Sequence, residues 1–262
     1  MFRKIIYSVF FMAMVACTTV PITGRRQLSL VSPAEMQAMS FQSYKQVLDT
    51  ARVLNNNDAA MVKRVGQRVR QAVESYMAQN NLSSQLKGFA WEFNLIQDQQ
   101  MNAWCMPGGK VAVYTGILPL TQNETGLAVV MGHEIAHAIA KHGDERMSQT
   151  MAAQLGASAA QVAVSNRTPV AQNIFLNAFG AGAQLGLLKY GRTQESEADH
   201  LGLIFMAMAG YDPQQAVSFW QRMASKSGGA APPEFLSTHP SDQTRIANIQ
   251  RIMPEALKYY KR

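Results

Sequence analysis

The sequence predicts an α+β fold that is mainly helical, with one small sheet beside a helix that carries the motif His-Glu-x-x-His. Apolar residues recur at helical spacing in residues 32–85 and 121–143, whereas residues 89–115 show the alternation typical of short strands. The chain has 262 residues, of which 47% are hydrophobic and 16% charged, so it can bury one sizeable core. We therefore expect one domain at 32–262, with a helical part at 32–85 and a core at 86–262 that carries the site.

Residues 1–16 have the features of a lipoprotein signal peptide. Two basic residues precede an apolar run from Ile5 to Val15, which is too short to span a membrane as a mature helix. Small residues then lead into Cys17, as they do at the acylation site of bacterial lipoproteins. We expect Cys17 to become the lipidated first residue and residues 17–31 to form an acylated tether.

The tether is expected to be flexible, because Thr18 to Val31 lacks periodicity and contains a proline and a glycine. Thr18 stands where, in many diderm bacteria, an aspartate would retain a lipoprotein at the inner membrane. We therefore expect a lipid anchor in the outer membrane, on its periplasmic face. The alternative is an ordinary secreted protein with a disulfide between Cys17 and Cys105.

The charge of the chain gives little information about partners. The formal net charge is +7, and loss of the two basic residues of the signal peptide leaves +5, scattered without a long run. Such a surface could favour anionic membranes, but simple solvation explains it equally well. No nucleic-acid motif is present, so we expect no nucleic-acid partner.

Two helices are predicted before the strands. Ser32-Pro33-Ala34-Glu35 combines an N-cap, a helix-opening proline and a capping-box glutamate, so the first helix should run from here to about Leu54. After a break at Asn55 to Asn57, apolar residues resume at helical spacing. We expect the following residues of the second helix in the core: Val62, Val65, Val69 and Val73.

Three short strands are predicted next. Phe89 to Leu95 alternates apolar and polar residues, as in a half-buried strand. Ala103 to Met106 and Val111 to Thr115 flank Pro107-Gly108-Gly109, a pattern that predicts a hairpin. A strand edge beside a reactive site can hold a peptide by main-chain hydrogen bonds. The alternative is a sheet that only completes the core.

The helix that carries His133-Glu134-Ile135-Ala136-His137 is the centre of the prediction. Thr121 and Glu124 form a capping box ahead of an apolar run, and Gly143 follows the run, so one helix of about five turns is expected. Histidines at i and i+4 can bind one Zn²⁺, with Glu134 beside the metal, where it can take a proton from the attacking water. The flanking residues are uncharged, and buried polar groups in such a frame need partners.

Two Ala- and Gly-rich segments, Asp144 to Ser165 and Pro169 to Lys189, are predicted to form a helical hairpin. Glutamines interrupt the first segment, and the apolar part of the second is shorter than the ~20 residues that a membrane span needs. We expect close packing of these helices, and a lid or membrane-touching role stays open.

A helix from Thr193 to Gly210 supplies a third metal ligand. Catalytic zinc usually has three protein ligands plus water, and two histidines with one glutamate are a known set. Glu195 and Asp199 are again i, i+4, so one can bind the metal while the other accepts the N–H of a ligand histidine. Glu197 is expected to act only as a partner of the helix dipole.

Together these elements resemble peptidase family forty-eight, the gluzincins of the HtpX and CAAX prenyl protease type, and specifically its soluble bacterial lipoprotein members of the BepA and LoiP type. The resemblance covers roughly Asn102 to Ile246. The metzincin alternative is poor, because Ala140 stands where that group has a glycine. The elements that carry the resemblance are Asn102-Ala103 with Pro107-Gly108-Gly109, His133 to His137, Glu195-x-x-Ala198-Asp199, and His239-Pro240 followed by Arg245-Ile246.

The resemblance implies a zincin-type metalloprotease domain with one Zn²⁺ per chain. Unlike HtpX, this chain is expected to lack transmembrane helices, which puts integral-membrane substrates in doubt. The implied roles are zinc ligands for His133, His137 and Glu195, general base for Glu134, partner of a ligand histidine for Asp199, and substrate binding for Asn102, Gly108 and Gly109.

His239 is a further catalytic residue in this prediction. It precedes Pro240 after a glycine-containing loop, and a residue before proline avoids helical angles. In relatives with this His-Pro element the histidine approaches the metal or the developing oxyanion, and both roles are open here. We expect no role in the site for His142, a helix-end residue, or for His200, a surface neighbour of Asp199.

The expected function is that of a zinc-dependent endopeptidase that cuts unfolded or misassembled envelope proteins in quality control, with the outer-membrane assembly machinery as a further partner. One alternative is a latent protease that acts mainly as a periplasmic chaperone or assembly factor. Another is a structural lipoprotein whose fourth zinc position is permanently filled. The intact Glu134 favours the enzyme, because a binding protein needs no base.

Overall fold

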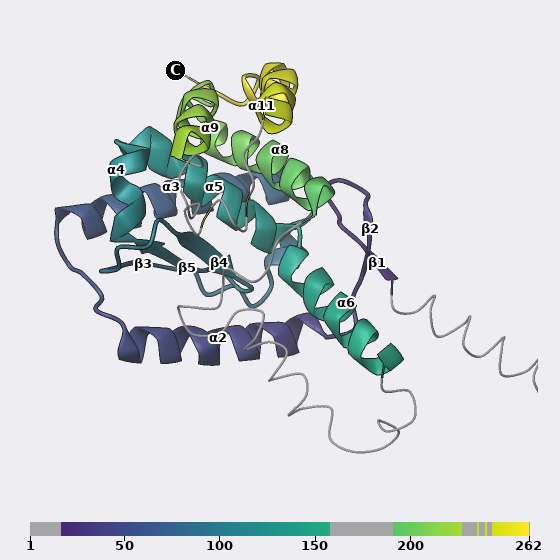
Figure 1. The fold of residues 1–262 in the computed structure, drawn as a ribbon. Coiled ribbons are helices and arrows are strands. Elements are labelled where there is room, and N and C mark those ends of the chain that lie inside the picture. The colour runs from purple at the N-terminus through teal and green to yellow at the C-terminus, as the bar shows by residue number, and fades with distance from the viewer. Residues whose placement is uncertain (1–16, 158–190, 227–234, 236–238, 240–242, 262) are drawn as a thin grey trace, which may run out of the picture.

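The computed structural model describes residues 17–157, 191–226, 235, 239 and 243–261 (Figure 1). The predicted signal peptide and most of the predicted helical hairpin after Gly143 lie outside these residues. The strands are β1 (Cys17–Thr19), β2 (Arg26–Leu28), β3 (Glu92–Ile96), β4 (Ala103–Met106) and β5 (Lys110–Tyr114). The helices are α2 (Pro33–Thr50), α3 (Asn57–Gln79), α4 (Leu118–Thr121), α5 (Glu124–Ile139), α6 (His142–Ala157), α8 (Arg192–Met208), α9 (Gln215–Ser225) and α11 (Gln243–Ala256), with short 3-10 turns at Ser83–Leu86 and Thr115–Ile117.

The main sheet has three strands in the order β3-β5-β4. β4 and β5 pair antiparallel, with Ala103 opposite Val113, and β3 runs parallel to β5. The turn between β4 and β5 needs its glycines, since Gly108 and Gly109 have φ angles of +84° and +83°. The predicted hairpin and the mainly helical α+β fold are confirmed, and β4 is an edge strand of this sheet.

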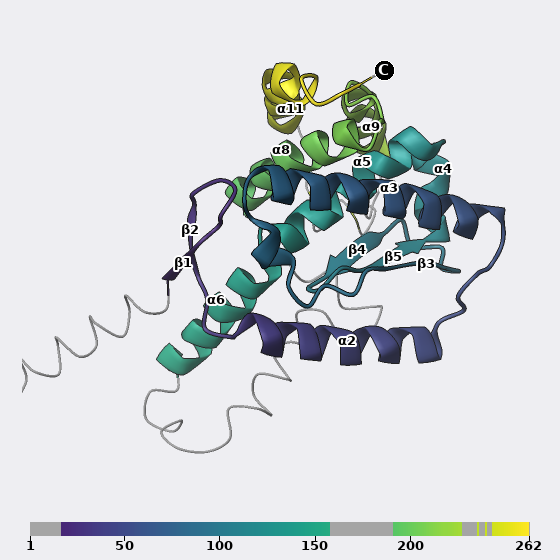
Figure 2. The same cartoon turned by 180° about the vertical axis from the view of Figure 1, so that it is seen from behind.

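Helices cover both faces of the sheet (Figures 1 and 2). Along β5, Val111 and Val113 point into the main core with α3 and α5, whereas Ala112 and Tyr114 point into a second cluster with α2. The predicted valines of α3 are all buried in the main core. The helix that carries the histidine motif therefore lies on one face of the sheet, and α8 crosses it on the side away from the strands.

The first helix begins as predicted and ends earlier. The Ser32 side chain accepts a hydrogen bond from the Glu35 N–H at 3.2 Å, and a proline occupies the first helical turn. The helix ends at Thr50, four residues before the predicted Leu54, because Ala51 is extended and Val53 then bridges to Ile96 of β3. This segment is thus held by the sheet edge.

The N-terminal segment is folded, so its prediction as a flexible tether was wrong. β1 and β2 form an antiparallel hairpin with Cys17 opposite Leu28, beside α6 and the start of α8 (Figures 1 and 2). Val20 is fully buried, and Arg25 bonds to carboxylates of both helices. Sequence periodicity missed the hairpin because its strands have three residues each and polar contacts hold it.

The motif helix α5 starts at a different cap from the one predicted. Asn123 is its N-cap and accepts a bond from the Gly126 N–H at 3.0 Å. Thr121 instead donates to the Leu118 carbonyl at 3.0 Å, and Glu124 pairs with Arg64, so the predicted capping box was wrong.

The end of α5 also differs from the prediction. The helix stops at Ile139, and Lys141 takes a positive φ of 57° before α6 begins at His142. Gly143 therefore lies within α6 instead of closing α5. Within the part of the chain that the structure describes, no helix has the length and hydropathy required to cross a membrane.

Candidate metal centre

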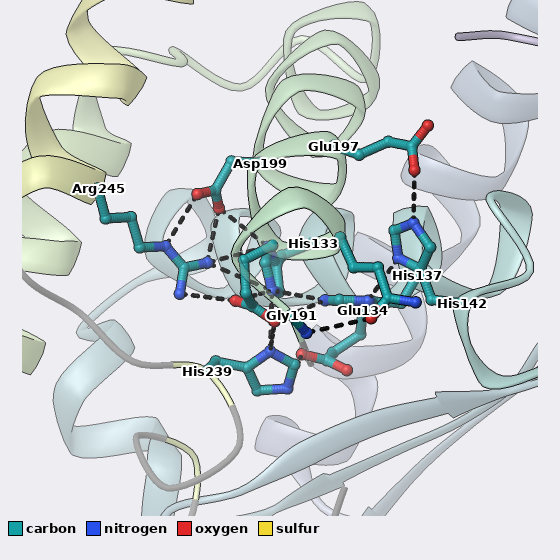
Figure 3. Close-up of polar contacts among 11 residues, drawn as sticks. His133, Glu134, His137, His142, Gly191, Glu197, Asp199, His239 and Arg245 are labelled. Carbon is teal, nitrogen blue, oxygen red and sulfur yellow. Dashed lines mark hydrogen bonds and ion pairs between the residues drawn. The ribbon is translucent and has the colours of Figure 1, made fainter. Parts of the chain in front are cut away.

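Four buried side chains meet at one point between α5 and α8. His133 and His137 lie one turn apart on α5, Glu195 lies in the first turn of α8, and His239 approaches from the segment after α9. One potential ligand atom from each residue lies within 4.8 Å of the others. The structure thus brings together the three expected ligands and the histidine whose role was open. Figure 3 shows His133, His137 and His239 gathered at this point.

The spacing of the four donors suits one metal ion. His133 Nε2 lies 3.0 Å from His137 Nε2 and 3.1 Å from His239 Nδ1. Glu195 oxygens lie 3.5 Å from His133 Nε2, 3.4 Å from His137 Nε2 and 2.9 Å from His239 Nδ1. A tetrahedron with zinc–nitrogen bonds of about 2.0–2.1 Å has edges of about 3.3 Å. These residues therefore fit a single Zn²⁺, and sulfur ligands are absent from the cluster.

Two of the expected ligands, Glu195 and His137, carry the charge that metal binding requires. Burial opposes ionisation of Glu195, but His239 and Arg245 hold its pKa well below its usual range. Burial lowers the pKa of His137 well below its ordinary value, so this imidazole is neutral at neutral pH. An ionised carboxylate and a neutral imidazole can both bind a metal without first losing a proton.

Glu134 lies beside the cluster and is not part of it. Its side chain is buried, and burial raises its pKa. Its Oε1 has no hydrogen-bond partner among the described residues, and the His239 Nε2 lies 3.4 Å away. A buried carboxylate oxygen without a hydrogen bond is costly, and its retention here is typical of a group that acts on a reactant.

Asp199 takes the place expected for the partner of a ligand histidine. Its Oδ1 lies 3.0 Å from His133 Nδ1, so the Nε2 of His133 is left to face the other donors. Burial acts to lower the pKa of His133, but hydrogen bonds to Asp199 and Glu195 raise it to about 9. Metal binding at this histidine therefore displaces a proton.

Arg245 links the carboxylates of Glu195 and Asp199 on α8, a role that was not predicted from the sequence. It binds Asp199 through two bonds, Nε to Oδ2 at 2.8 Å and Nη2 to Oδ1 at 2.7 Å, and its Nη1 lies 2.9 Å from Glu195. Its guanidinium carbon lies 3.4 Å from the ring centroid of Trp220. This buried cation holds both acids in place, and its only sequence signal was its position after the His-Pro element.

The second ligand histidine of α5 also has a partner, and this was missed. His142 Nδ1 lies 2.8 Å from His137 Nδ1, and His142 Nε2 lies 2.7 Å from Glu197 Oε2. His142 is fully buried and Glu197 is 8% exposed, so the expectation that both stand outside the site was wrong. Figure 3 shows the two supports on opposite sides of the centre, Asp199 with Arg245 and His142 with Glu197.

The residues expected to bind substrate have other contacts. Asn102 is buried, and its side chain accepts the Ala103 N–H at 2.9 Å. A Cβ on Gly108 or Gly109 would collide with the rings of Phe41 or Trp91, so both glycines allow the turn to pack on aromatic side chains. None of these contacts involves a donor of the cluster, and their role in binding substrate stays a prediction.

The remaining predicted residues lie outside the cluster. Cys17 opens β1, and Cys105 is a free, buried cysteine, which contradicts a disulfide between the two. His200 is a surface residue, as expected, and its Nε2 pairs with Glu255 at 2.9 Å.

Comparison with known proteins gives one family. A sequence model described as Peptidase family M48 matches residues 63–253. The chain is 35% identical to the mitochondrial metalloendopeptidase OMA1 of Schizosaccharomyces pombe, over 90% of this chain and 66% of that protein. It is 35% identical to OMA1 of Saccharomyces cerevisiae, over 68% of this chain and 52% of that protein. A putative beta-barrel assembly-enhancing protease of Vibrio cholerae is 35% identical over 60% of this chain and 33% of its own length.

Proposed function

Because the chain belongs to peptidase family M48, we propose that it is a zinc-dependent endopeptidase whose single Zn²⁺ is held by His133, His137 and Glu195. One observation carries this proposal: these three donors converge at zinc spacing beside the buried carboxylate of Glu134. The chain spans between a third and two thirds of the length of these three relatives. The activities in their names are therefore those of the relatives.

In the proposed mechanism Glu134 moves the proton. When bound, zinc would polarise the scissile carbonyl and acidify the attacking water. Glu134 accepts a proton from that water and later donates it to the leaving amine. Its raised pKa, which burial causes, suits a carboxylate that must both accept and return a proton.

Asp199 and Arg245 position the ligands in this proposal. Asp199 fixes the proton of His133 on Nδ1, and Arg245 holds the Glu195 and Asp199 carboxylates at a set distance from each other. The stack of Arg245 on Trp220 limits the freedom of the guanidinium. These contacts orient the donors before a substrate arrives.

His239 is proposed to occupy the fourth donor position at rest. Its Nδ1 lies 3.1 Å from His133 Nε2 and 2.9 Å from Glu195 Oε1, within the same cluster as the other donors. In this position it keeps the protease latent, and its displacement would open the site. The same geometry favours a second candidate, a structural zinc site with four permanent ligands, and Glu134 is the feature that such a site would not need.

The proposed substrates are unfolded or misassembled envelope proteins. Support comes from the relatives named beta-barrel assembly-enhancing protease. β4 ends the described sheet beside the motif helix, but all four of its residues are buried, so it could pair with an extended peptide only after becoming exposed. We also propose that Cys17 is acylated and anchors the chain at the periplasmic face of the outer membrane. A latent form could act there mainly as an assembly factor.

Two experiments test these proposals. Purified protein should cleave an unfolded protein, lose that activity with a chelator and regain it with one equivalent of zinc. Activity that is unaffected by complete removal of metal would overturn the proposed function. Cys17→Ala should release the protein from membranes in fractionation, and wild-type protein in the inner membrane would contradict the proposed location.

A further inference from the structure

A chain of hydrogen bonds leads from His137 to the N-terminal hairpin, and the proposed mechanism does not use it. His137 Nδ1 meets His142 Nδ1 at 2.8 Å, and His142 Nε2 meets Glu197 Oε2 at 2.7 Å. The Glu197 carboxylate accepts bonds from the Thr23 hydroxyl and from Arg25 Nε, the latter at 2.7 Å. This series of hydrogen bonds thus joins a metal-ligand candidate on α5 to residues more than a hundred positions earlier in the sequence.

Only one placement of protons satisfies the hydrogen bonds from His137 through His142 to Glu197 when His137 binds a metal through Nε2. Its Nδ1 must then carry the proton and donate it to His142 Nδ1, which accepts. The proton of His142 therefore lies on Nε2 and is donated to Glu197, which is ionised. Both imidazoles are neutral in this arrangement, and every ring nitrogen of the pair has a defined role.

Three different elements, the N-terminal hairpin, α6 and α8, fix the Arg25 end of this series of hydrogen bonds. Arg25 Nη1 donates to Glu145 Oε1 of α6 at 2.9 Å, and Gln194 Nε2 of α8 donates to Glu145 Oε2 at 2.7 Å. Glu145 and Gln194 are buried, whereas the Arg25 side chain is 21% exposed. The hairpin residue therefore closes a network between α6 and α8 at its solvent side.

We propose that His142 and Glu197 are positioning residues for the ligand His137, and that Thr23 and Arg25 of the hairpin complete this support. The inference rests on the proposed zinc site. Partners that hold the second nitrogen of a ligand histidine typically change metal affinity 10–100-fold when they are removed. Docking of the hairpin thereby contributes to metal affinity, although none of its residues approaches the four donors.

The two ligand histidines of α5 are supported in different ways. Asp199 contacts His133 directly, whereas Glu197 acts on His137 through His142. An ion pair between Glu197 and Arg25 alone would stabilise only the fold. The interposed imidazole, which uses one nitrogen toward each neighbour, is the observation that connects this pair to the metal centre.

The test is the zinc dissociation constant of the full chain, measured by competition with a chromophoric chelator. His142→Ala and Glu197→Ala should each weaken zinc binding 10–100-fold, and Glu197→Gln, which keeps an acceptor oxygen, should lose less. Arg25→Met should give a loss near the lower end of that range. Ser148→Ala is the matched control. Ser148 is fully buried and accepts a hydrogen bond from the Leu30 N–H at 2.9 Å, and it is not part of the hydrogen-bond series from His137 to Arg25.

The outcomes separate this inference from the proposed function. Tight zinc in the wild type with unchanged affinity in all four variants would overturn the inference and leave the zinc site standing. A wild-type protein that binds no zinc would overturn both. Circular dichroism of the metal-free proteins shows which variants fold, and if His142→Ala does not, Glu197→Gln and Arg25→Met decide.

A second readout is independent of affinity and of activity. Nitrogen-15 NMR of the zinc-loaded protein should find the proton of His137 on Nδ1 and that of His142 on Nε2. In Glu197→Ala the His142 proton should exchange faster or change position. The opposite tautomer of His142 in the wild type would contradict the inference, whatever the affinities are.

Discussion

Gly132 of α5 and Gly202 of α8 face each other where the two helices cross. A Cβ on Gly202 would lie 2.9 Å from the His133 backbone nitrogen and 3.0 Å from the Gly132 carbonyl carbon. Gly202 shares a face of α8 with Glu195 and Asp199, at i+7 and i+3. The close approach at the two glycines is therefore what brings both acids within reach of the α5 histidines.

This relationship predicts the effect of Gly202→Ala. The added methyl meets backbone and cannot be absorbed by a side-chain rotation, so the helices must separate, with a stability loss of about 1–3 kcal/mol in denaturant unfolding. Zinc affinity should fall as well. Gly191→Ala is the control, since among the described residues only the end of the Gln194 side chain lies near its Cβ, at 3.8 Å. Equal losses of stability and zinc affinity in the two variants would show that the close approach of α5 and α8 does not position the metal ligands.

Removal of a ligand should have the largest effect on metal binding. His137→Ala and Glu195→Gln should each lose more zinc affinity than the 10–100-fold expected for an outer partner such as Asp199. His200→Ala should bind zinc as the wild type does, because His200 pairs with Glu255 at the surface. The measurement is zinc content and affinity of the purified variants. Wild-type zinc content in Glu195→Gln would place the third ligand elsewhere.

Glu197 should make stability depend on pH. Burial opposes its ionisation, but His142, Thr23 and Arg25 together lower its pKa to about 2 from a usual 4.5. A depressed pKa stabilises the fold above about pH 4.5, and this contribution is lost as pH falls toward 2. The stability gap between wild type and Glu197→Gln, measured on metal-free protein, should thus be full at pH 7 and shrink below pH 4.5. A gap that widens on acidification would contradict this assignment.

His239→Ala distinguishes a resting block from a catalytic role. If His239 fills the fourth donor position at rest, its removal should raise basal cleavage of an unfolded protein. If it instead stabilises the oxyanion, turnover should fall by roughly 10²–10³-fold with little change in zinc affinity. We expect the increase, because His239 Nδ1 lies among the donors. An unchanged rate with unchanged zinc would exclude both roles.

The local features of the fold could be predicted from the sequence. The core valines of α3, the Ser32 cap and the hairpin of β4 and β5 depend on residues close together in the chain, where periodicity and turn residues are informative. The N-cap of α5 was predicted wrongly because Thr121 and Asn123 are both residue types that favour this position. The tertiary contact of Glu124 with Arg64 decided between them.

The site could be predicted only in part, for a similar reason. Helical geometry relates His133 and His137, so their i, i+4 spacing is informative in the sequence. The choice of Glu195 over Asp199 as the third ligand rested on the resemblance to the peptidase family. The supports do not follow from spacing, since Arg25 lies 172 positions from Glu197 and Arg245 lies 46 positions from Asp199. Only the folded chain shows that they meet.

The proposed peptidase is tested most directly by measuring both the zinc content and the peptidase activity of Glu134→Gln. The amide keeps the shape of the side chain and removes the base, so zinc should remain at one per chain while cleavage of an unfolded protein falls ~10²-fold or more. The variant should also retain the wild-type fold, because Glu134 is not one of the four donors. Wild-type cleavage by clean Glu134→Gln protein with full zinc would contradict the proposed peptidase.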